Sequence, residues 1–396
     1  MSYDFDSCID RRSIANLNKW NWYPEDVLPL WIADMDFRTP EPILDALRAA
    51  LDHGILGYEF ASSSLLELVA GRAQQVWGWT IAPESIVALP NVNIGYRVAA
   101  SSACRAGEGV LMQPPVFYDF VDFPPAYGLV RQVAPLRRVD QGQVIRYEFD
   151  LDLVRQAIHD GVKTGMFLLC NPHNPVGRIF SVDEMTRLAS LCKEKDILLC
   201  SDDIHHELLL GEAAYTPIAA LAPDIGERTI TLFGPGKGYN MSGLGCAFAV
   251  IPDAVRRRRF TQELGRLSLF PSSAGLIAAR VVYSGACDEW LAAVRAYLTA
   301  NRDALVTFVK QELPGLATTI PDATYLAWVD CSEYIRAGII TGSPSEFFLK
   351  KAQVALSDGA PYGPGGESFV RLNFACPRAV LEEALQRIKQ ALARPH

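Results

Sequence analysis

Short apolar runs recur through the middle of the chain, and this recurrence limits the possible folds more than any other feature. Helix-like segments separate these runs, which lie at residues 85–89, 109–113, 165–170, 197–201, 229–233 and 245–251. Runs that are apolar throughout are typical of strands covered on both faces. Ser181 with Glu184 three residues later forms a capping box, which predicts a helix that continues to Lys195. Strands that alternate with helices predict an α/β fold with a largely parallel sheet.

A second pattern begins after about residue 275. The sequence there predicts a helix-rich stretch, two strands and a closing helix, at residues 286–311, 325–330, 370–375 and 378–394. A chain of 396 residues exceeds what one hydrophobic core usually supports, so two domains of unequal size are expected. The first part of the chain, rich in Trp and Pro, is expected to pack on the second domain. We therefore predict an N-terminal arm, a large domain and a small C-terminal domain over residues 1–45, 46–275 and 276–396.

Charge and composition exclude several classes of protein. The net charge is −8, and the one dense basic run, Arg256 to Arg259, is too small to follow a phosphate backbone, so we expect no nucleic-acid partner. No stretch of about eighteen uncharged apolar residues predicts a membrane span. The acidic start MSYDFDSCID lacks the basic and apolar blocks of a secretory leader, so the expected location is the cytoplasm. Nine scattered cysteines without a C-x-x-C pair suit reduced thiols and argue against a zinc site.

A lysine stands between two glycines shortly after one of the expected strands. Lys237, between Gly236 and Gly238, is sterically open and can lose its water shell, and both properties suit an amine that must act as a neutral nucleophile. The competing interpretation is a P-loop, but the pattern G-x-x-x-x-G-K-[ST] requires a hydroxyl residue at position 238. The glycine there disfavours nucleotide binding.

Other polar residues follow or interrupt the expected strands. Asp202 ends a buried run, and a buried carboxylate is costly unless a cation or a donor meets it. Asn174 lies between two Asn-Pro steps that fix the backbone, although such steps are plain turns in most proteins. Arg371 lies inside an apolar strand, where it is either paired or open to a carboxylate. Adjacent His205 and His206 would point to opposite faces of an extended chain, which disfavours a shared metal.

A reactive lysine, a buried acid, an amide donor and a carboxylate-binding arginine together suit one cofactor. Chemistry with pyridoxal 5'-phosphate (PLP) requires a lysine that binds the aldehyde and an acid that keeps the pyridine nitrogen protonated. It also requires a donor to the ring oxygen and an arginine for the carboxylate of an amino acid. We therefore predict PLP as the cofactor and an amino acid as the substrate.

Several longer segments carry a family resemblance over nearly the whole chain. They are Lys19-Trp20, Leu28-Pro29-Leu30-Trp31-Ile32-Ala33-Asp34-Met35-Asp36-Phe37, Gly54 to Tyr58, Pro115-Val116-Phe117 and Thr324 to Trp328, besides the Asn174, Asp202, Lys237 and Arg371 segments. The chain resembles PLP-dependent enzymes of fold type I, the class I/II aminotransferase superfamily, and within it the MalY/PatB group of cystathionine β-lyases. The resemblance implies an aspartate-aminotransferase-like fold, with helices covering a mostly parallel mixed sheet in the large domain and a smaller α+β domain after it.

The resemblance also implies a role for each matching residue around the cofactor. Lys237 would bind PLP covalently and act as the catalytic residue, and Asp202 would pair with the ring nitrogen. Asn174 and His205 would lie beside the ring oxygen. Phe117 would stack on the ring, where the family usually has tyrosine.

Two further implications concern the substrate and a partner chain. Arg371 would hold the substrate carboxylate, with help from the backbone near Ala33. Tyr58 would reach the phosphate of the neighbouring subunit, which implies a homodimer with shared active sites.

The lysine loop departs from the family pattern. Gly234 and Gly236 replace the hydroxyl residues that usually lie near the phosphate, and Gly238 replaces the usual Thr or Ala. The phosphate must therefore rely on backbone N–H groups near Val92 and Asn93, at the start of the expected helix after residue 89.

The predicted activity is that of a carbon–sulfur β-lyase acting on cystathionine, cysteine or a cysteine S-conjugate. An aminotransferase, or an elimination or replacement enzyme that closes a ring in secondary metabolism, is the alternative, motivated by the reshaped lysine loop. A regulatory binding protein on the same fold is a third hypothesis, against which the intact Lys237, Asp202 and Arg371 argue.

Overall fold

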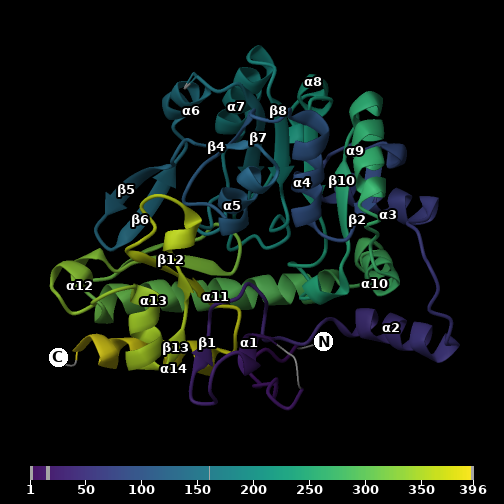
Figure 1. The fold of residues 1–396 in the computed structure, drawn as a ribbon. Coiled ribbons are helices and arrows are strands. Elements are labelled where there is room, and N and C mark those ends of the chain that lie inside the picture. Colours follow the sequence, from purple (N-terminus) through teal and green to yellow (C-terminus); the bar gives the residue numbers. More distant parts are fainter. Residues whose placement is uncertain (1–2, 15–17, 160, 394–396) are drawn as a thin grey trace.

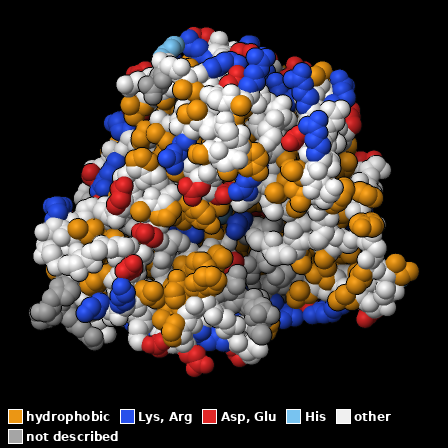
Figure 2. Space-filling view, in the orientation of Figure 1, with side chains coloured by type: hydrophobic (Ala, Val, Ile, Leu, Met, Phe, Trp, Pro, Cys, Tyr) orange, Lys and Arg blue, Asp and Glu red, His pale blue; other side chains and the backbone are white. Residues whose placement is uncertain are grey.

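The computed structural model describes residues 3–14, 18–159 and 161–393. Figure 1 shows two halves: a sheet flanked by helices above, and the long helix α11 (Asp288–Glu312) with a second sheet below. Figure 2 shows a hollow between the halves on this face, with basic side chains in it. None of the described helices is long and apolar enough to cross a membrane.

The upper half contains a seven-stranded sheet of order β2-β10-β9-β8-β7-β3-β4. The strands are β2 (Ile86–Leu89), β3 (Gly109–Met112), β4 (Val130–Val133), β7 (Thr164–Cys170), β8 (Leu198–Asp202), β9 (Thr229–Phe233) and β10 (Ala247–Val250). β10 is antiparallel to both of its neighbours, and every other pair is parallel. All six apolar runs are therefore strands, as predicted, in a mixed and mostly parallel sheet.

Helices cover both faces of this sheet, which explains why its strands are apolar throughout. In β7, Met166 and Leu168 face a core shared with α4, α5 and α9, while Phe167 and Leu169 face a core shared with α6 and α7. The predicted capping box at Ser181 is present. The helices of this half are α3 (Ser63–Trp77), α4 (Val92–Ala103), α5 (Tyr118–Ala126), α6 (Leu151–Ile158), α7 (Val182–Glu194), α8 (Pro223–Gly226), α9 (Ala254–Arg266) and α10 (Ser273–Tyr283).

The lower half contains a six-stranded sheet of order β14-β15-β12-β11-β6-β5. Its strands are β5 (Arg137–Gln141), β6 (Val144–Glu148), β11 (Ala317–Thr319), β12 (Leu326–Asp330), β14 (Ser357–Asp358) and β15 (Phe369–Asn373). β6 pairs in parallel with β11, so a hairpin from the expected large domain completes the sheet of the expected small domain. The division at residue 275 remains a prediction, and this hairpin crosses it.

The N-terminal segment packs on the C-terminal half. β1 (Leu28–Pro29) pairs in parallel with β13 (Val354–Ala355). Phe5, Leu30, Met35 and Phe37 are buried in the same core as α11 and α14. The remaining elements are α1 (Asn18–Asn21), α2 (Glu41–His53), α12 (Ser332–Arg336), α13 (Pro344–Phe347), α14 (Arg378–Ala393), the π-helical turn η4 (Phe348–Ala352), and the 3₁₀ turns η1 (Pro83–Ser85), η2 (Ile218–Ala220), η3 (Ser242–Leu244) and η5 (Ala360–Tyr362). The last residue of the predicted closing helix, Arg394, lies outside the described residues.

Candidate active site

The ends of three neighbouring parallel strands bring the predicted residues together. β7, β8 and β9 lie side by side, and the pairing aligns Cys170 with Asp202 and Asp202 with Leu232. The turns that follow these strands carry Asn174, His205 and Lys237. The carboxyl edge of a parallel sheet is where α/β proteins bind ligands, so this cluster is the candidate active site.

Lys237 is partly buried at the meeting point of the two halves. Its Nζ donates a hydrogen bond to the backbone carbonyl of Ala33 at 2.6 Å. Burial and the nearby charge of Arg371, opposed by the charges of Asp34 and Asp202, lower the pKa of this amine to about 8. A large share of the amine is therefore neutral at mildly alkaline pH, as a nucleophile or a base requires.

Asp202 is a buried acid, and its Oδ1 accepts a hydrogen bond from the backbone N–H of Ile204 at 3.1 Å. Burial raises the pKa of its carboxyl to about 7, against the effect of the Lys237 charge. Asp202 forms no ion pair among the residues that the structure describes. A cation beside it would therefore favour its ionised form.

The two histidines after Asp202 lie in a turn, so the prediction of an extended chain was wrong. The backbone N–H of His206 donates to the carbonyl of Asp203, and that of Leu208 donates to the carbonyl of His205. The His205 ring lies 5.9 Å from the Tyr325 ring and its Nδ1 has no hydrogen-bond partner within the described ranges. Burial, aided by the charge of Lys237, lowers the pKa of His205, so this ring is neutral.

The His206 ring points away from this site. It lies 4.6 Å from the ring of Trp77, among other aromatic side chains. The two rings therefore occupy different environments. In the described chain, no three His, Cys, Asp or Glu side chains form a group that could hold a metal ion.

Arg371 lies in β15 with its guanidinium directed at neutral partners. It donates to Asn174 Oδ1 at 3.2 Å, to the carbonyl of Trp31 at 2.9 Å and to Ser357 Oγ at 3.2 Å. Its Nε has no hydrogen-bond partner in the part of the chain that the structure describes. The ring of Tyr362 lies 5.3 Å from the guanidinium carbon. An arginine held in place without a carboxylate is prepared to bind one.

The start of α4 lies near the start of α5, and the backbone N–H groups of Val92 and Asn93 have no hydrogen-bond partner among the described residues. Asn91 caps α4 by accepting from the N–H of Ile94 at 2.9 Å, so the helix begins at Val92, where the sequence predicted a helix start. Asn93 donates to Asp119 in the first turn of α5 at 3.4 Å. The half-buried Phe117 directly precedes α5.

Tyr58 does not join the other predicted residues. Its side chain is 99% exposed, in the segment between α2 and α3. Among the residues that the structure describes, no hydrogen bond, ion pair or ring contact joins Tyr58 to the cluster.

Other residues at the site had no role in the sequence prediction. Tyr325 donates to the carbonyl of Ala33 at 2.9 Å, and Asn373 Nδ2 donates to the carbonyls of Ile32 and Asp34 at 2.7 and 2.6 Å. The segment around Ala33 is therefore held from β15. The sequence placed Tyr325 in an expected strand and in a segment that carries the family resemblance, but neither signal reveals where its hydroxyl points.

Close packing explains two glycines of the lysine loop, Gly234 and Gly238. A Cβ atom at Gly238 would lie 2.6 Å from Glu207 Oε2, and one at Gly234 would lie 2.9 Å from the Cα of Ala247. No side chain fits at either position unless its surroundings move. These two departures from the family pattern thus follow from the neighbours of the loop.

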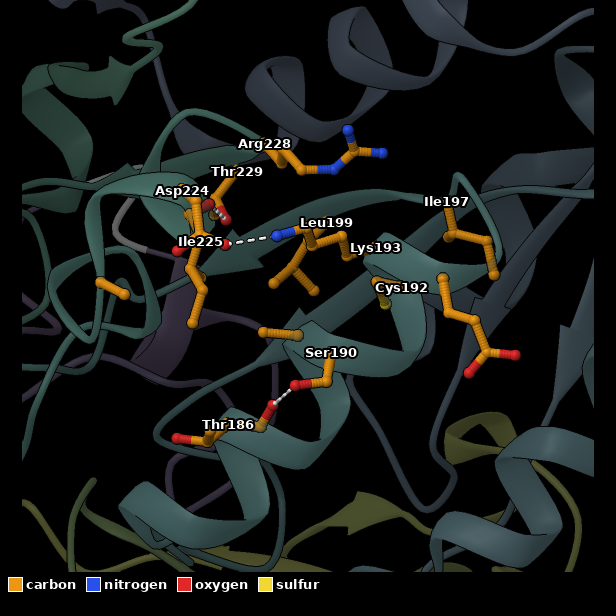
Figure 3. Close-up of a pocket in the computed structure, with 13 residues that line it drawn as sticks. Thr186, Ser190, Cys192, Lys193, Ile197, Leu199, Asp224, Ile225, Arg228 and Thr229 are labelled. Atoms are coloured by element: carbon orange, nitrogen blue, oxygen red, sulfur yellow. Dashed lines mark hydrogen bonds and ion pairs between the residues drawn. The ribbon is translucent and has the colours of Figure 1, made fainter.

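A hollow of ≈ 490 Å³ elsewhere contains none of the predicted site residues. It lies beside α7, β8 and α8, and Figure 3 shows Lys193 and Asp224 joined across it. Ser190 donates to the backbone of α7. Its other two charged side chains, Glu194 and Arg228, pair with Lys195 and Asp196 beside it, so every charged group of this hollow is paired, unlike Asp202 in the strand-end cluster.

The fold and the site define an α/β enzyme of the aspartate-aminotransferase type. The family described as aminotransferase class I and II matches residues 28–388. The chain therefore belongs to the aminotransferase class I and II family.

Individual relatives cover nearly the full chain. Cystathionine β-lyase PatB of Bacillus subtilis (strain 168) is 36% identical over 93% of each chain. The structure of the PLP-bound C–S lyase from Staphylococcus hominis matches with a TM-score of 0.91 and 30% identity, over 100% of this chain and 99% of that one. The structure of OvoB matches with a TM-score of 0.90 and 36% identity, over 100% of both chains.

Proposed function

We propose that the protein is a PLP-dependent carbon–sulfur β-lyase that acts on an amino acid such as cystathionine or a cysteine S-conjugate. The observation that carries the proposal is the cluster at one edge of the sheet: the partly buried amine of Lys237, the buried acid Asp202, and the guanidinium of Arg371, which meets no carboxylate among the described residues. The relatives support it, because one is a cystathionine β-lyase and another a PLP-bound C–S lyase.

The unpaired atoms of the site fit PLP and an amino acid. Asp202 meets no cation within the described ranges, so it is open to a protonated pyridine nitrogen. His205 Nδ1 and Arg371 Nε are buried without partners, and a ring oxygen and a carboxylate satisfy them. When bound, PLP supplies an electron-withdrawing ring that stabilises negative charge on the substrate Cα.

Each predicted residue has a place in this proposal. Lys237 forms the covalent link to PLP. The groups around the cofactor are Asp202 at the ring nitrogen, Asn174 and His205 at the ring oxygen, Phe117 on the ring face, and the backbone N–H groups of Val92 and Asn93 at the phosphate. The helix start at residue 92 supports the last assignment, because free N–H groups and the helix dipole both favour an anion.

The chain's own groups hold the substrate and move its proton. Arg371 binds the carboxylate, assisted by the backbone near Ala33. The amine of Lys237, once free, takes the proton from Cα, and its lowered pKa favours the neutral form that a base needs. A thiolate then leaves from Cβ, and the remaining fragment hydrolyses to pyruvate and ammonia.

A homodimer with shared active sites is part of the proposal. Tyr58, Ile55, Leu56 and Phe60 are exposed on one short segment, and the Phe270 ring lies 5.8 Å from that of Phe60. Figure 2 shows hydrophobic side chains on the edge where this segment joins α2 to α3. Contiguous exposed apolar side chains mark interaction surfaces. A second copy of the chain covers this surface and receives Tyr58 at its cofactor phosphate.

The cytoplasm is the proposed location. The nine cysteines are all free, and seven of them are buried. Unpaired buried thiols suit a reducing compartment.

An aminotransferase, or an elimination or replacement enzyme that closes a ring, is the alternative. The glycine-lined lysine loop favours it, because Gly238 and Glu207 shape the backbone next to the reactive amine. The first steps are shared, and the reactions diverge only after the proton leaves Cα.

The decisive experiment is incubation with L-cystathionine and no keto acid. Sustained release of pyruvate supports the lyase, whereas a single half-turnover supports transamination. Lys237→Ala should lower the rate by about 10²–10⁴-fold, as for the loss of a general base, and should abolish the visible absorbance that borohydride removes. Lys193→Ala, which breaks only an exposed ion pair, should match the wild type. A Lys237→Ala variant with full activity would contradict the proposal.

A further inference from the structure

One backbone oxygen is the acceptor for two side chains at the site. The carbonyl of Ala33 accepts from Lys237 Nζ at 2.6 Å and from Tyr325 Oη at 2.9 Å. Tyr325 is buried, with 1% of its surface exposed, and Lys237 is partly buried. The hydroxyl and the reactive amine therefore meet at one atom.

The surroundings of Ala33 keep this oxygen in place. Asn373 binds the carbonyls on either side of it, those of Ile32 and Asp34. Arg371 binds the carbonyl of Trp31. These hydrogen bonds hold the backbone to β15 on both sides of Ala33. The direction from which a donor can approach the Ala33 carbonyl therefore depends on the lone pairs of its oxygen.

The Tyr325 hydroxyl affects the Lys237 amine because both groups donate to the same carbonyl oxygen. A carbonyl oxygen has two lone pairs. The Tyr325 hydroxyl uses one of them, which leaves a single direction for the amine of Lys237. Burial raises the pKa of Tyr325, so the hydroxyl stays protonated and remains a donor.

We propose that Tyr325 is a positioning residue for the amine of Lys237 and acts through the Ala33 carbonyl to which both groups donate. The inference rests on the proposed function, in which the free amine moves the proton of Cα. The amine rests on this carbonyl whenever it is not linked to the cofactor. The hydroxyl restricts that resting position to one orientation and weakens the pull of the oxygen on a charged amine.

Tyr325→Phe tests the inference in the cofactor-free protein. The pH dependence of Lys237 labelling by fluorodinitrobenzene, followed on the Lys237 peptide by mass spectrometry, gives the pKa of the amine. Without the hydroxyl, the oxygen accepts more strongly from the charged amine, so we expect this pKa to rise from about 8 toward about 9. An unchanged pKa would overturn the inference, whatever the enzyme catalyses.

The loaded enzyme gives a second readout. The Tyr325→Phe variant should lose about 2- to 12-fold in kcat with KM almost unchanged, and its isotope effect with α-deuterated substrate should increase. A rise in KM that matches the fall in kcat would instead make Tyr325 a substrate-binding residue and overturn the inference. Failure of the wild type to release pyruvate would count against the proposed function and leave the labelling result valid.

Matched variants separate positioning from packing. Tyr283→Phe removes another buried hydroxyl, one without a partner in the described residues, and should leave both readouts at wild-type values. An equal effect of Tyr283→Phe would overturn the inference. If Tyr325→Phe does not fold, 3-fluorotyrosine at position 325, a stronger donor, should lower the Lys237 pKa, and a rise or no change would count against the proposal.

Discussion

The charged side chains on one side of the site are paired with one another, whereas those on the other side are not. On the side of the N-terminal segment, Asp36 binds Lys19 at 2.9 Å and Arg11 at 2.6 Å, and Asp34 binds Arg11 at 3.0 Å. On the side of the strand ends, Asp202 has no ion pair and Arg371 has no carboxylate within the described ranges.

The difference in pairing distinguishes charged groups that hold the fold together from those that are open to a ligand. Buried charges that are paired within the chain hold a segment in position, and removing one partner leaves the other uncompensated. Buried polar groups without partners are costly, and such groups cluster where a ligand completes them. The paired aspartates therefore fix the backbone around Ala33, and the unpaired groups opposite are those that the proposed function assigns to the cofactor and the substrate.

The largest expected effect is the loss of stability on the paired side. Lys19→Met combined with Arg11→Met removes both cations that the buried carboxylate of Asp36 binds, and we expect a decrease of about 3–5 kcal/mol in the free energy of unfolding by urea. Lys193→Met, which breaks an exposed pair with Asp224, should cost about 0–1 kcal/mol. Equal losses in the two variants would remove the distinction between scaffold and surface pairs.

On the side of the strand ends, where the charged groups are unpaired, a mutation should lower activity without lowering stability. Asp202→Asn keeps the shape but removes the charge, so we expect kcat/KM to fall about 30- to 5000-fold. The pKa of Asp202 is raised from 3.8 to about 7, so its ionisation removes stability as pH rises through this interval. At pH 8 the cofactor-free Asp202→Asn protein should therefore unfold at the same or a higher urea concentration than the wild type. A lower urea midpoint would show that Asp202 belongs to the scaffold.

The smallest expected effect concerns Glu207, an exception to the rule that buried polar groups without partners mark a ligand site. Glu207 Oε2 is buried without a hydrogen-bond partner among the described residues, yet it packs against Gly238. Gly238→Ala should lower stability by about 1–3 kcal/mol through overpacking, and the added Glu207→Ala change should recover part of that loss. Gly243→Ala, with nothing within 4 Å of its added Cβ, is the control. Strictly additive losses would show that Glu207 does not determine the glycine.

Sequence reasoning located the strands of the upper sheet because each is buried on both faces. It missed β5, whose residues Arg137–Gln141 are mostly exposed and charged, and β4, whose first two residues are exposed. It also missed the parallel pairing of β6 with β11, since nothing local in Val144–Glu148 indicates a partner so far along the chain.

The sequence indicated those candidate site residues whose positions depend on strand ends. Lys237, Asp202 and Arg371 each stand out because a charge follows or interrupts an apolar run. Tyr325 does not stand out, because its role depends on the carbonyl of a residue 292 positions away. The requirement for glycine at position 238 is equally hard to predict, because it arises from the packing of the Glu207 side chain against the loop.

The attachment of the N-terminal segment has a consequence for biosynthesis. Asn373 binds the carbonyl of Asp34 across 339 positions, and β1 pairs with β13. A ribosome adding about 5–20 residues per second needs roughly 17–70 s to cover that distance. The N-terminal segment is therefore synthesised well before the strands that it contacts. The Ala33 carbonyl can take its final position only after β15 has been synthesised.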